Sequence, residues 1–552
     1  MYFSITDRSL LFCFLYFFIC YTALQAQPNQ FTRQDTLRGS ITKERAWWDL
    51  TYYHLNIQVN PADSTIRGVN TIQYKVLQEY PLMQIDLQPP LNIEKVLQNG
   101  KELSFNREGN AYFIRLSGQQ TPGSTQALSV FYSGKPQISK RPPWSGGITW
   151  KKDARGNPFI ASTCQGDGAS LWWPCKDHMY DEPDSMLISV RVPKNLTNVS
   201  NGRLRKTERH KDGTTTYHWF VSNPINNYGV NINIGDYVHF SEKYKGEKGE
   251  LDCDYYVLRD NLGKAKEQFK EVKRMLEAFE YWFGPYPFYE DSYKLVETPY
   301  LGMEHQSSVT YGNGYQNGYL GRDLSQTGYG LKFDFIIVHE SGHEWFANNI
   351  TYQDIADMWI HESFTAYSEN LFLDYHVGKE ASAAYVLGTR SNIANDRPII
   401  GTYSVNKSGS VDMYYKGANM LHTLRQIVND DKKWRDMLRG LNQKFYHQTV
   451  TTAQIENYLS KKSGKDLTPF FNQYLRTTQI PALEYRLMGN TLSYRWGSCV
   501  EGFAIPVKVW INGEERWLEP TKQWKSIENL PANTTLKVDP NFYVIPFDLT
   551  IK

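Results

Sequence analysis

The segment His339-Glu-Ser-Gly-His343, with Glu362 downstream, constrains this chain more than any other feature. Residues four apart lie on one face of an α-helix, so His339 and His343 can present two imidazoles to a single cation. Eighteen residues separate His343 from Glu362, which leaves room for the chain to turn back and begin a second helix at residues 358–376. The spacing therefore predicts two packed helices that share a metal site.

Two imidazoles and one carboxylate are the ligands of a catalytic zinc, because they leave the fourth position open for water. Glu340 lies one position round from His339, where it can reach a metal-bound water without being a ligand. A chance HExxH pattern on a buried helix is the alternative, and it arises in roughly one chain in a hundred of this length. A downstream acid on its own helix favours the catalytic interpretation. We therefore predict one Zn²⁺ per chain, bound by His339, His343 and Glu362, with Glu340 as the base.

Composition limits the size of the domains and the class of partner. The chain has 552 residues, too many for one hydrophobic core, and about three or four domains are expected. The 60 basic and 58 acidic residues nearly balance, and no basic cluster stands out. Nucleic acid is therefore not an expected partner.

The first residues have the pattern of an export signal. An apolar run at residues 10–21 follows Arg8 and precedes a plausible signal-peptidase site at residues 22–26. The run is short for a membrane span, and an uncleaved anchor is the alternative. We expect a signal peptide at residues 1–26, cleaved near Ala26, then a linker at residues 27–45. The mature chain would be exported to the periplasm or the extracellular space, without a transmembrane span.

Four cysteines follow the expected signal peptide: Cys164, Cys175, Cys253 and Cys499. None has CxxC spacing, so a second metal site of that type is not expected. Cys164 and Cys175 can pair in an oxidising compartment, and two buried free thiols are the equal alternative.

Three regions of different periodicity predict a multidomain α+β protein. Residues 46–240 alternate apolar and polar positions, which predicts an N-terminal antiparallel β domain. Residues 241–478 contain short strands and then mainly helical segments, as in a mixed α+β catalytic domain. Residues 479–552 return to short strands, with hairpin turn signals at Gly489-Asn490 and Asn512-Gly513, which predicts a small β-sandwich.

A zinc peptidase also needs an oxyanion donor and substrate anchors. Tyr414 is a candidate donor, although a core or surface tyrosine is the alternative on spacing alone. Glu304 follows a predicted strand and is flanked by Gly302 and Met303. Its carboxylate can bind a substrate ammonium group, although most isolated glutamates are simply solvated.

Three groups of residues together resemble the M1 family of zinc aminopeptidases. They are Gly302-Met-Glu304, the HExxH segment with Glu362, and Tyr414-Tyr-Lys-Gly-Ala418, in this order and at this spacing. The likeness extends over most of the expected mature chain, including residues 162–165 and 173–177. The resemblance implies a thermolysin-like, mainly helical zinc domain in which Tyr414 stabilises the oxyanion.

The resemblance also implies roles for residues that spacing alone does not assign. Glu304 and Gln165 would bind the free α-amino group of a peptide substrate. Glu369, seven residues after Glu362, would orient a zinc-binding imidazole. Gly302 and Met303 would lie beside the peptide on an edge strand.

Three positions or regions depart from the family pattern. His305 replaces the usual Asn after the anchoring Glu, and His361-Glu-Ser363 stands where Asn-Glu-Gly is common. After Pro481 the sequence predicts strands, not the large C-terminal helical domain of many members. The two histidines leave the chemistry intact and could alter ligand pKa values or helix packing.

We therefore expect an exported zinc aminopeptidase that removes single residues from peptides with a free N-terminus. A zinc endopeptidase is one alternative, but an amine anchor at Glu304 and Gln165 has no use at an internal bond. Hydrolysis of a lipid epoxide is a minor alternative. A non-catalytic peptide-binding protein on the same fold is another, against which the complete set of zinc ligands and base argues. The sequence does not set the oligomeric state or the preferred N-terminal residue.

Overall fold

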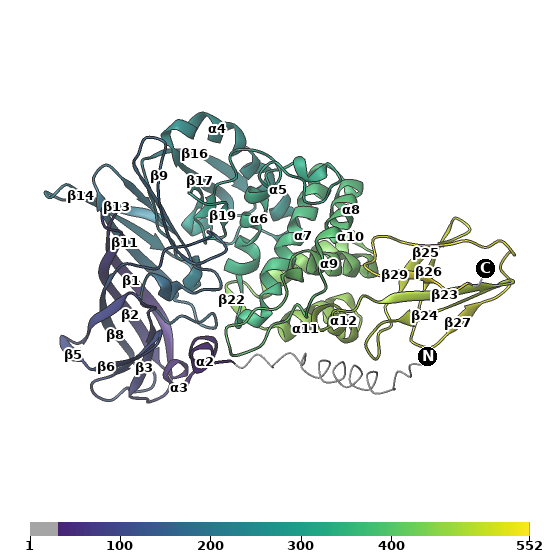
Figure 1. Ribbon diagram of the computed structural model, residues 1–552, viewed down its shortest axis with the longest axis horizontal. Helices are drawn as coiled ribbons and strands as arrows, with labels where there is room; N and C mark the ends of the chain where they lie inside the picture. The colour runs from purple at the N-terminus through teal and green to yellow at the C-terminus, as the bar shows by residue number, and fades with distance from the viewer. Residues whose placement is uncertain (1–30, 551–552) are drawn as a thin grey trace, which may run out of the picture.

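The computed structural model describes residues 31–550. Figure 1 shows N-terminal sheets at one end of the longest axis, helices in the middle and C-terminal strands at the other end. The expected fold class is confirmed by this arrangement. The expected signal peptide at residues 1–26 lies outside the described residues. Within residues 31–550, no helix has both the length and the apolar composition needed to cross a bilayer.

An eight-stranded sheet forms the base of the N-terminal domain, in the order β13-β14-β11-β1-β2-β8-β4-β5. Its strands are β1 (Trp48–Asn60), β2 (Thr65–Val76), β4 (Asn92–Gln98), β5 (Lys101–Leu103), β8 (Thr125–Gly134), β11 (Ser185–Pro193), β13 (Arg203–Arg209) and β14 (Thr214–Val221). Burial mostly alternates along β1, which is why its sequence shows a two-residue period. The pairing is mainly antiparallel, as expected, but β1 and β11 run parallel.

Two smaller sheets complete the N-terminal domain, in the orders β12-β15-β10-β9 and β3-β7-β6. Their strands are β3 (Leu82–Asp86), β6 (Phe105–Glu108), β7 (Ala111–Arg115), β9 (Gly147–Lys152), β10 (Pro158–Thr163), β12 (Thr197–Val199) and β15 (Asn233–Gly235). Gln165 follows β10 almost directly, so this sheet places the candidate amine anchor.

The segment expected to be a linker, residues 27–45, is helical in part. It contains α2 (Arg33–Gly39) and most of α3 (Lys43–Ala46). Arg45 is fully buried and pairs with Asp86 of β3. The two helices therefore pack onto the β domain, and the linker assignment is wrong for this part of the chain.

A five-stranded sheet opens the catalytic domain, in the order β16-β17-β18-β20-β19. Its strands are β16 (Tyr237–Gly246), β17 (Gly249–Leu258), β18 (Tyr293–Glu297), β19 (Gly302–Met303) and β20 (Val309–Tyr311). The boundary expected at residue 240 falls inside β16, which pairs with β17 along its whole length. The catalytic domain therefore begins at the start of β16. β19 forms one edge of the sheet.

Helices make up most of the rest of this domain. They are α4 (Leu262–Gln268), α5 (Glu271–Phe283), α6 (Phe335–Gly342), α7 (Trp359–His376), α8 (Lys379–Gly388), α9 (Tyr415–Val428), α10 (Asp431–Lys444), α11 (Thr452–Ser463) and α12 (Thr468–Arg476). α7 contacts α5, α6, α8 and α9, and its residues 359–373 are all buried. The short strand β21 (Ile350–Tyr352) lies between α6 and α7 in the chain and pairs with β22 (Gln448–Val450).

The C-terminal region has two sheets, ordered β27-β24-β23-β29 and β26-β25-β28. Their strands are β23 (Ala482–Met488), β24 (Thr491–Gly497), β25 (Val507–Ile511), β26 (Glu514–Leu518), β27 (Lys525–Ile527), β28 (Leu536–Val538) and β29 (Ile545–Asp548). Both expected hairpins form, and Asn512 and Gly513 have the positive φ values (54° and 86°) that a tight hairpin turn requires. Apolar side chains of this region join one continuous core with the catalytic helices.

Candidate metal centre and substrate cleft

α6 is a short helix that carries His339 in its last turn and has His343 as its C-cap residue. Asp334 caps its first turn by accepting hydrogen bonds from the backbone N–H groups of Ile336 and Ile337. The rings of His339 and His343 lie 5.1 Å apart, centroid to centroid. The helix ends at Gly342, and a π-type turn (Glu344–Asn348) follows. A helical conformation thus covers the motif itself and little beyond it.

Close packing of α6 on α7 brings Glu362 to the two histidines. Gly342 permits this approach, because a Cβ atom there would lie only 2.6 Å from Oγ of Ser368 on α7. Glu362 Oε2 lies 3.4 Å from Nε2 of His343 and 3.9 Å from Nε2 of His339. The predicted ligands therefore converge, with donor atoms all within 4.8 Å of one another.

The donor set fits a divalent metal. Glu362 Oε2 is buried and has no hydrogen-bond partner among the described residues, which is costly for a carboxylate unless a cation faces it. Two imidazole nitrogens and one carboxylate oxygen are the protein ligands of catalytic zinc sites.

In each imidazole, Nδ1 faces a hydrogen-bond acceptor of the protein. His339 Nδ1 lies 2.7 Å from Glu369 Oε1, and the second oxygen of Glu369 accepts a hydrogen bond from Tyr385 Oη at 2.6 Å. His343 Nδ1 lies 3.0 Å from the carbonyl oxygen of Phe346. These acceptors favour the tautomer with the proton on Nδ1, which leaves each Nε2 free to bind a metal.

The electrostatics of the centre also favour a cation. Burial raises the pKa of Glu340 to about 7. For His343, burial lowers the pKa, but the carboxylates of Glu362 and Glu304 outweigh it and raise the pKa to about 10. Buried carboxylates thus dominate the local field, and a bound metal ion would neutralise them.

A cavity of about 570 Å³ lies over the centre and collects the predicted site residues. Those that line it are Gln165, Gly302, Met303, Glu304, His339, Glu340, His343, Glu362 and Tyr414. Glu369 does not line it, because it lies behind His339. Trp144, Tyr319 and Phe335 also line this cavity. The cleft therefore combines a polar, charged floor with aromatic walls.

Gln165 and Glu304 meet in this cleft although they come from different domains. Gln165 Nε2 donates to Glu304 Oε1 at 2.6 Å and to Glu362 Oε1 at 3.2 Å. Tyr228 Oη also donates to Glu304 Oε1, at 3.2 Å. Glu304 is 2% exposed, and burial raises its pKa. The pair forms a polar corner directly beside a predicted metal ligand.

Tyr414 stands at the start of α9 with its ring 6.1 Å from that of His339. Burial raises the pKa of its phenol well above the usual value, so the hydroxyl keeps its proton and can donate a hydrogen bond. Ser363 Oγ donates to the carbonyl of Met413, the residue before Tyr414, at 2.6 Å. Gly417 makes room for it, since a Cβ there would lie 1.9 Å from Ser363 Oγ. The serine that departs from the family pattern therefore fixes the start of α9.

His305 and His361, the two histidines that depart from the family pattern, are buried and neutral. His361 Nε2 accepts a hydrogen bond from the backbone N–H of Tyr352 at 2.9 Å, and the two rings stack 4.2 Å apart. Burial lowers the pKa of His361 well below its usual value, and it lowers that of His305 to about 3. His361 thus joins α7 to β21 by packing and a backbone hydrogen bond.

Sequence reasoning missed the partners that hold the site residues in place. Tyr228, Tyr385 and the carbonyl of Phe346 each contact a predicted site residue. They belong to separate segments, and no spacing rule links them to the HExxH motif. The question left open for Cys164 and Cys175 is answered: both are buried free thiols.

Comparison with known families assigns the chain. The Peptidase family M1 domain matches residues 267–474, and the Peptidase M1 N-terminal domain matches residues 50–228. The chain belongs to peptidase family M1. This membership and the donor set together indicate zinc as the cofactor of the centre.

Relatives of this M1 peptidase include an archaeal and an animal protein. It is 22% identical to leucyl aminopeptidase of Saccharolobus solfataricus over 77% of this chain and 54% of that protein. It is also 22% identical to leukotriene A-4 hydrolase of Xenopus laevis over 75% of this chain and 68% of that protein. The chain thus spans about half the length of the archaeal relative.

Solved structures share the fold. The M1 zinc metallopeptidase from Deinococcus radiodurans superposes with a TM-score of 0.68, at 21% identity, over 79% of this chain and 95% of that one. A variant of that enzyme bound to the substrate Tyr-Ser-Ala superposes with a TM-score of 0.66, at 20% identity, over 79% of this chain and 96% of that one.

Proposed function

We propose that this M1 peptidase is a zinc aminopeptidase that removes single residues from the free N-terminus of peptides. The observation that carries the proposal is the position of the candidate amine anchor: Gln165 Nε2 lies within 3.2 Å of both Glu304 and the predicted ligand Glu362. The α-amine of a peptide is two bonds from its first carbonyl carbon. An amine held at Glu304 would therefore bring the first peptide bond, and no later one, to the metal centre.

The residues of the chain supply proton transfer and hydrogen bonding. When zinc is bound, it supplies Lewis acidity that lowers the pKa of water and polarises the carbonyl. Glu340, with its pKa raised to about 7, takes a proton from the attacking water and then gives one to the leaving amine. Tyr414 keeps its proton and donates a hydrogen bond to the oxyanion.

Substrate binding would use the polar corner of the cleft. The Glu304 carboxylate and the Gln165 amide oxygen are acceptors for the three N–H bonds of an α-ammonium group. The Coulomb attraction between a carboxylate buried at this depth and a charged partner is stronger than at an exposed site. A peptide with a blocked N-terminus would leave this carboxylate buried without a charged partner.

The test is product analysis of an unblocked octapeptide by mass spectrometry with the zinc-loaded protein. We expect a ladder of products, each shorter by one residue at the N-terminus. Glu340→Gln should retain zinc and lose about 10²–10⁴ in turnover, because it removes the proton carrier and not a ligand. Glu380→Gln, at an exposed position of α8, is the matched control and should behave as wild type. Internal fragments would favour an endopeptidase, and bound but intact peptide would favour a binding protein.

Export is a separate part of the proposal and rests on the apolar run at residues 10–21. We expect the exported protein to begin at Gln27 when its N-terminus is sequenced. Retention inside the cell with residues 1–26 uncleaved would contradict it.

A further inference from the structure

The loop that carries Gln165 is a compact turn built on two glycines. Gly166 and Gly168 have φ values of 74° and 94°, in the left-handed region that favours glycine. The backbone N–H of Gly168 donates to the carbonyl of Cys164 at 2.7 Å and closes the turn around Gln165. The direction of the Gln165 side chain therefore depends on how this turn is held.

The glycines of the turn also line a small pocket beside charged side chains. The pocket has a volume of about 40 Å³, and its lining includes Arg38, Gly166, Gly168 and Asp177. Two of these residues, Arg38 and Asp177, carry opposite charges.

Arg38 and Asp177 fix the turn on both sides of Gly168. Arg38 Nη2 donates to the carbonyl of Gly166, the residue after Gln165, at 2.9 Å. Asp177 accepts hydrogen bonds from the backbone N–H groups of Ala169 and Ser170 at 3.3 and 3.2 Å. A Cβ at Gly168 would lie 2.4 Å from Arg38 Nη2 and 2.2 Å from Asp177 Oδ2. Both side chains therefore lie in close contact with Gly168, and a larger residue would not fit there.

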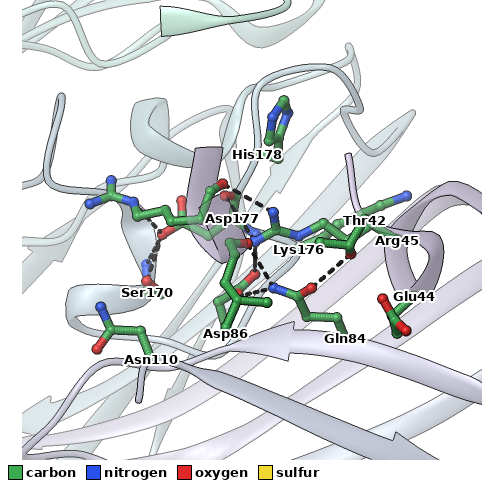
Figure 2. Close-up of polar contacts among 12 residues, drawn as sticks. Thr42, Glu44, Arg45, Gln84, Asp86, Asn110, Ser170, Lys176, Asp177 and His178 are labelled. Atoms are coloured by element: carbon green, nitrogen blue, oxygen red, sulfur yellow. Dashed lines mark hydrogen bonds and ion pairs between the residues drawn. The ribbon is translucent and has the colours of Figure 1, made fainter. Parts of the chain in front are cut away.

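A buried charge cluster anchors Arg38 itself. Arg45 donates to the carbonyl of Arg38 at 3.0 Å and pairs with Asp86 Oδ2 at 2.6 Å. The same Asp86 oxygen accepts from the backbone N–H of Asp177 at 3.1 Å, and Gln84 donates to the other oxygen at 2.8 Å. Figure 2 shows Arg45, Asp86, Asp177 and Gln84 in one group of contacts. The cluster therefore ties α2 and α3, which precede residue 50, to the Gln165 turn.

We propose that Arg38 is a positioning residue for the amine anchor, holding Gln165 against Glu304 through the carbonyl of Gly166. The inference rests on the proposed function, because it assigns Arg38 a role in placing the substrate α-amine. A misplacement of about 1 Å at a binding group can cost up to about 10²-fold in rate, so a loosened turn has a measurable effect. The helices before residue 50 therefore contribute to the substrate-binding site. Arg38 lies 127 positions before Gln165 in the sequence.

The experiment compares Arg38→Ala with Arg33→Ala in the zinc-loaded, full-length protein. Arg33 lies on the same helix, and its exposed side chain pairs with Glu108, so it is a matched control. We expect Arg38→Ala to raise KM and lower kcat/KM about 10-fold on unblocked peptides, with zinc content and melting temperature close to those of Arg33→Ala. Arg38→Lys should restore part of the loss, because it keeps a donor near Gly166.

A double-mutant cycle shows whether the effect passes through Gln165. In a Gln165→Ala background, Arg38→Ala should lower kcat/KM by less than about 2-fold further, because the group it positions is already absent. A full 10-fold loss in that background, or an Arg38→Ala variant equal to Arg33→Ala, overturns the proposal. If Arg38→Ala does not fold, Arg38→Lys takes its place in the cycle under the same criterion. If Gln165→Ala itself leaves kcat/KM on unblocked peptides unchanged, the proposed amine anchor is wrong. The other outcomes test only the role of Arg38.

Discussion

Removing the Glu369 carboxylate should weaken zinc binding without touching a ligand. Glu369 is 1% exposed, lies 2.7 Å from His339 Nδ1 and accepts from Tyr385 Oη at 2.6 Å. Glu369→Gln keeps the shape and loses the charge, so a charge-assisted hydrogen bond becomes a neutral one, a difference of about 1–1.5 kcal/mol. That difference corresponds to about a tenfold weaker zinc Kd. Glu369→Ala leaves both partners without an acceptor, and about 100-fold is expected.

The assay is competition for zinc between the apoprotein and a chromogenic chelator at fixed pH. Tyr385→Phe is a graded control, because it removes the hydroxyl and leaves the carboxylate on His339 in place. It should change the zinc Kd by less than about threefold. A zinc Kd unchanged in Glu369→Ala would refute the reasoning, since His339 would then be oriented by something else.

Two further predictions concern catalysis and stability. Tyr414→Phe should lower kcat with little change in KM, costing about 3–4 kcal/mol if the phenol donates to the oxyanion; a rise in KM alone would assign Tyr414 to ground-state binding. Burial lowers the pKa of His422 to about 3, so below pH 6.5 the unfolded chain binds a proton that the folded chain does not. The free energy of unfolding should fall by about 1.4 kcal/mol per pH unit between about pH 6 and pH 4 for this group. His422→Asn should reduce the measured slope in urea unfolding by this amount relative to wild type, whereas equal slopes in the two proteins would contradict the burial argument.

The sequence predicted best what short-range geometry determines. The spacing of His339, His343 and Glu362 depends on helical periodicity, and the structure brings these three donor atoms together. The hairpin at Asn512-Gly513 likewise follows from local turn chemistry. By contrast, alternation continues across residue 240, and periodicity cannot tell which sheet a strand such as β16 joins.

Long-range contacts account for what the sequence did not show. α2 is only seven residues long, and α3 is held beside it by the buried pairing of Arg45 with Asp86, which no local pattern reveals. Tyr385 and Tyr228 reach the site from separate segments. Gln165 entered only through a family resemblance, because a lone glutamine in a loop carries no signal of its own.

The most direct test of the account compares one peptide with a free N-terminus and the same peptide acetylated. The zinc-loaded wild type should cleave the free peptide and almost fail to cleave the acetylated one, since the blocked amine offers Glu304 no charge. Hydrogen bonds to charged groups contribute about 1.5–3 kcal/mol each, so Glu304→Ala should lower kcat/KM on the free peptide by roughly 10- to 150-fold. The same substitution should leave the residual rate on the acetylated peptide unchanged. Equal kcat/KM values for the two peptides in the wild type would contradict the amine anchor and the aminopeptidase assignment with it.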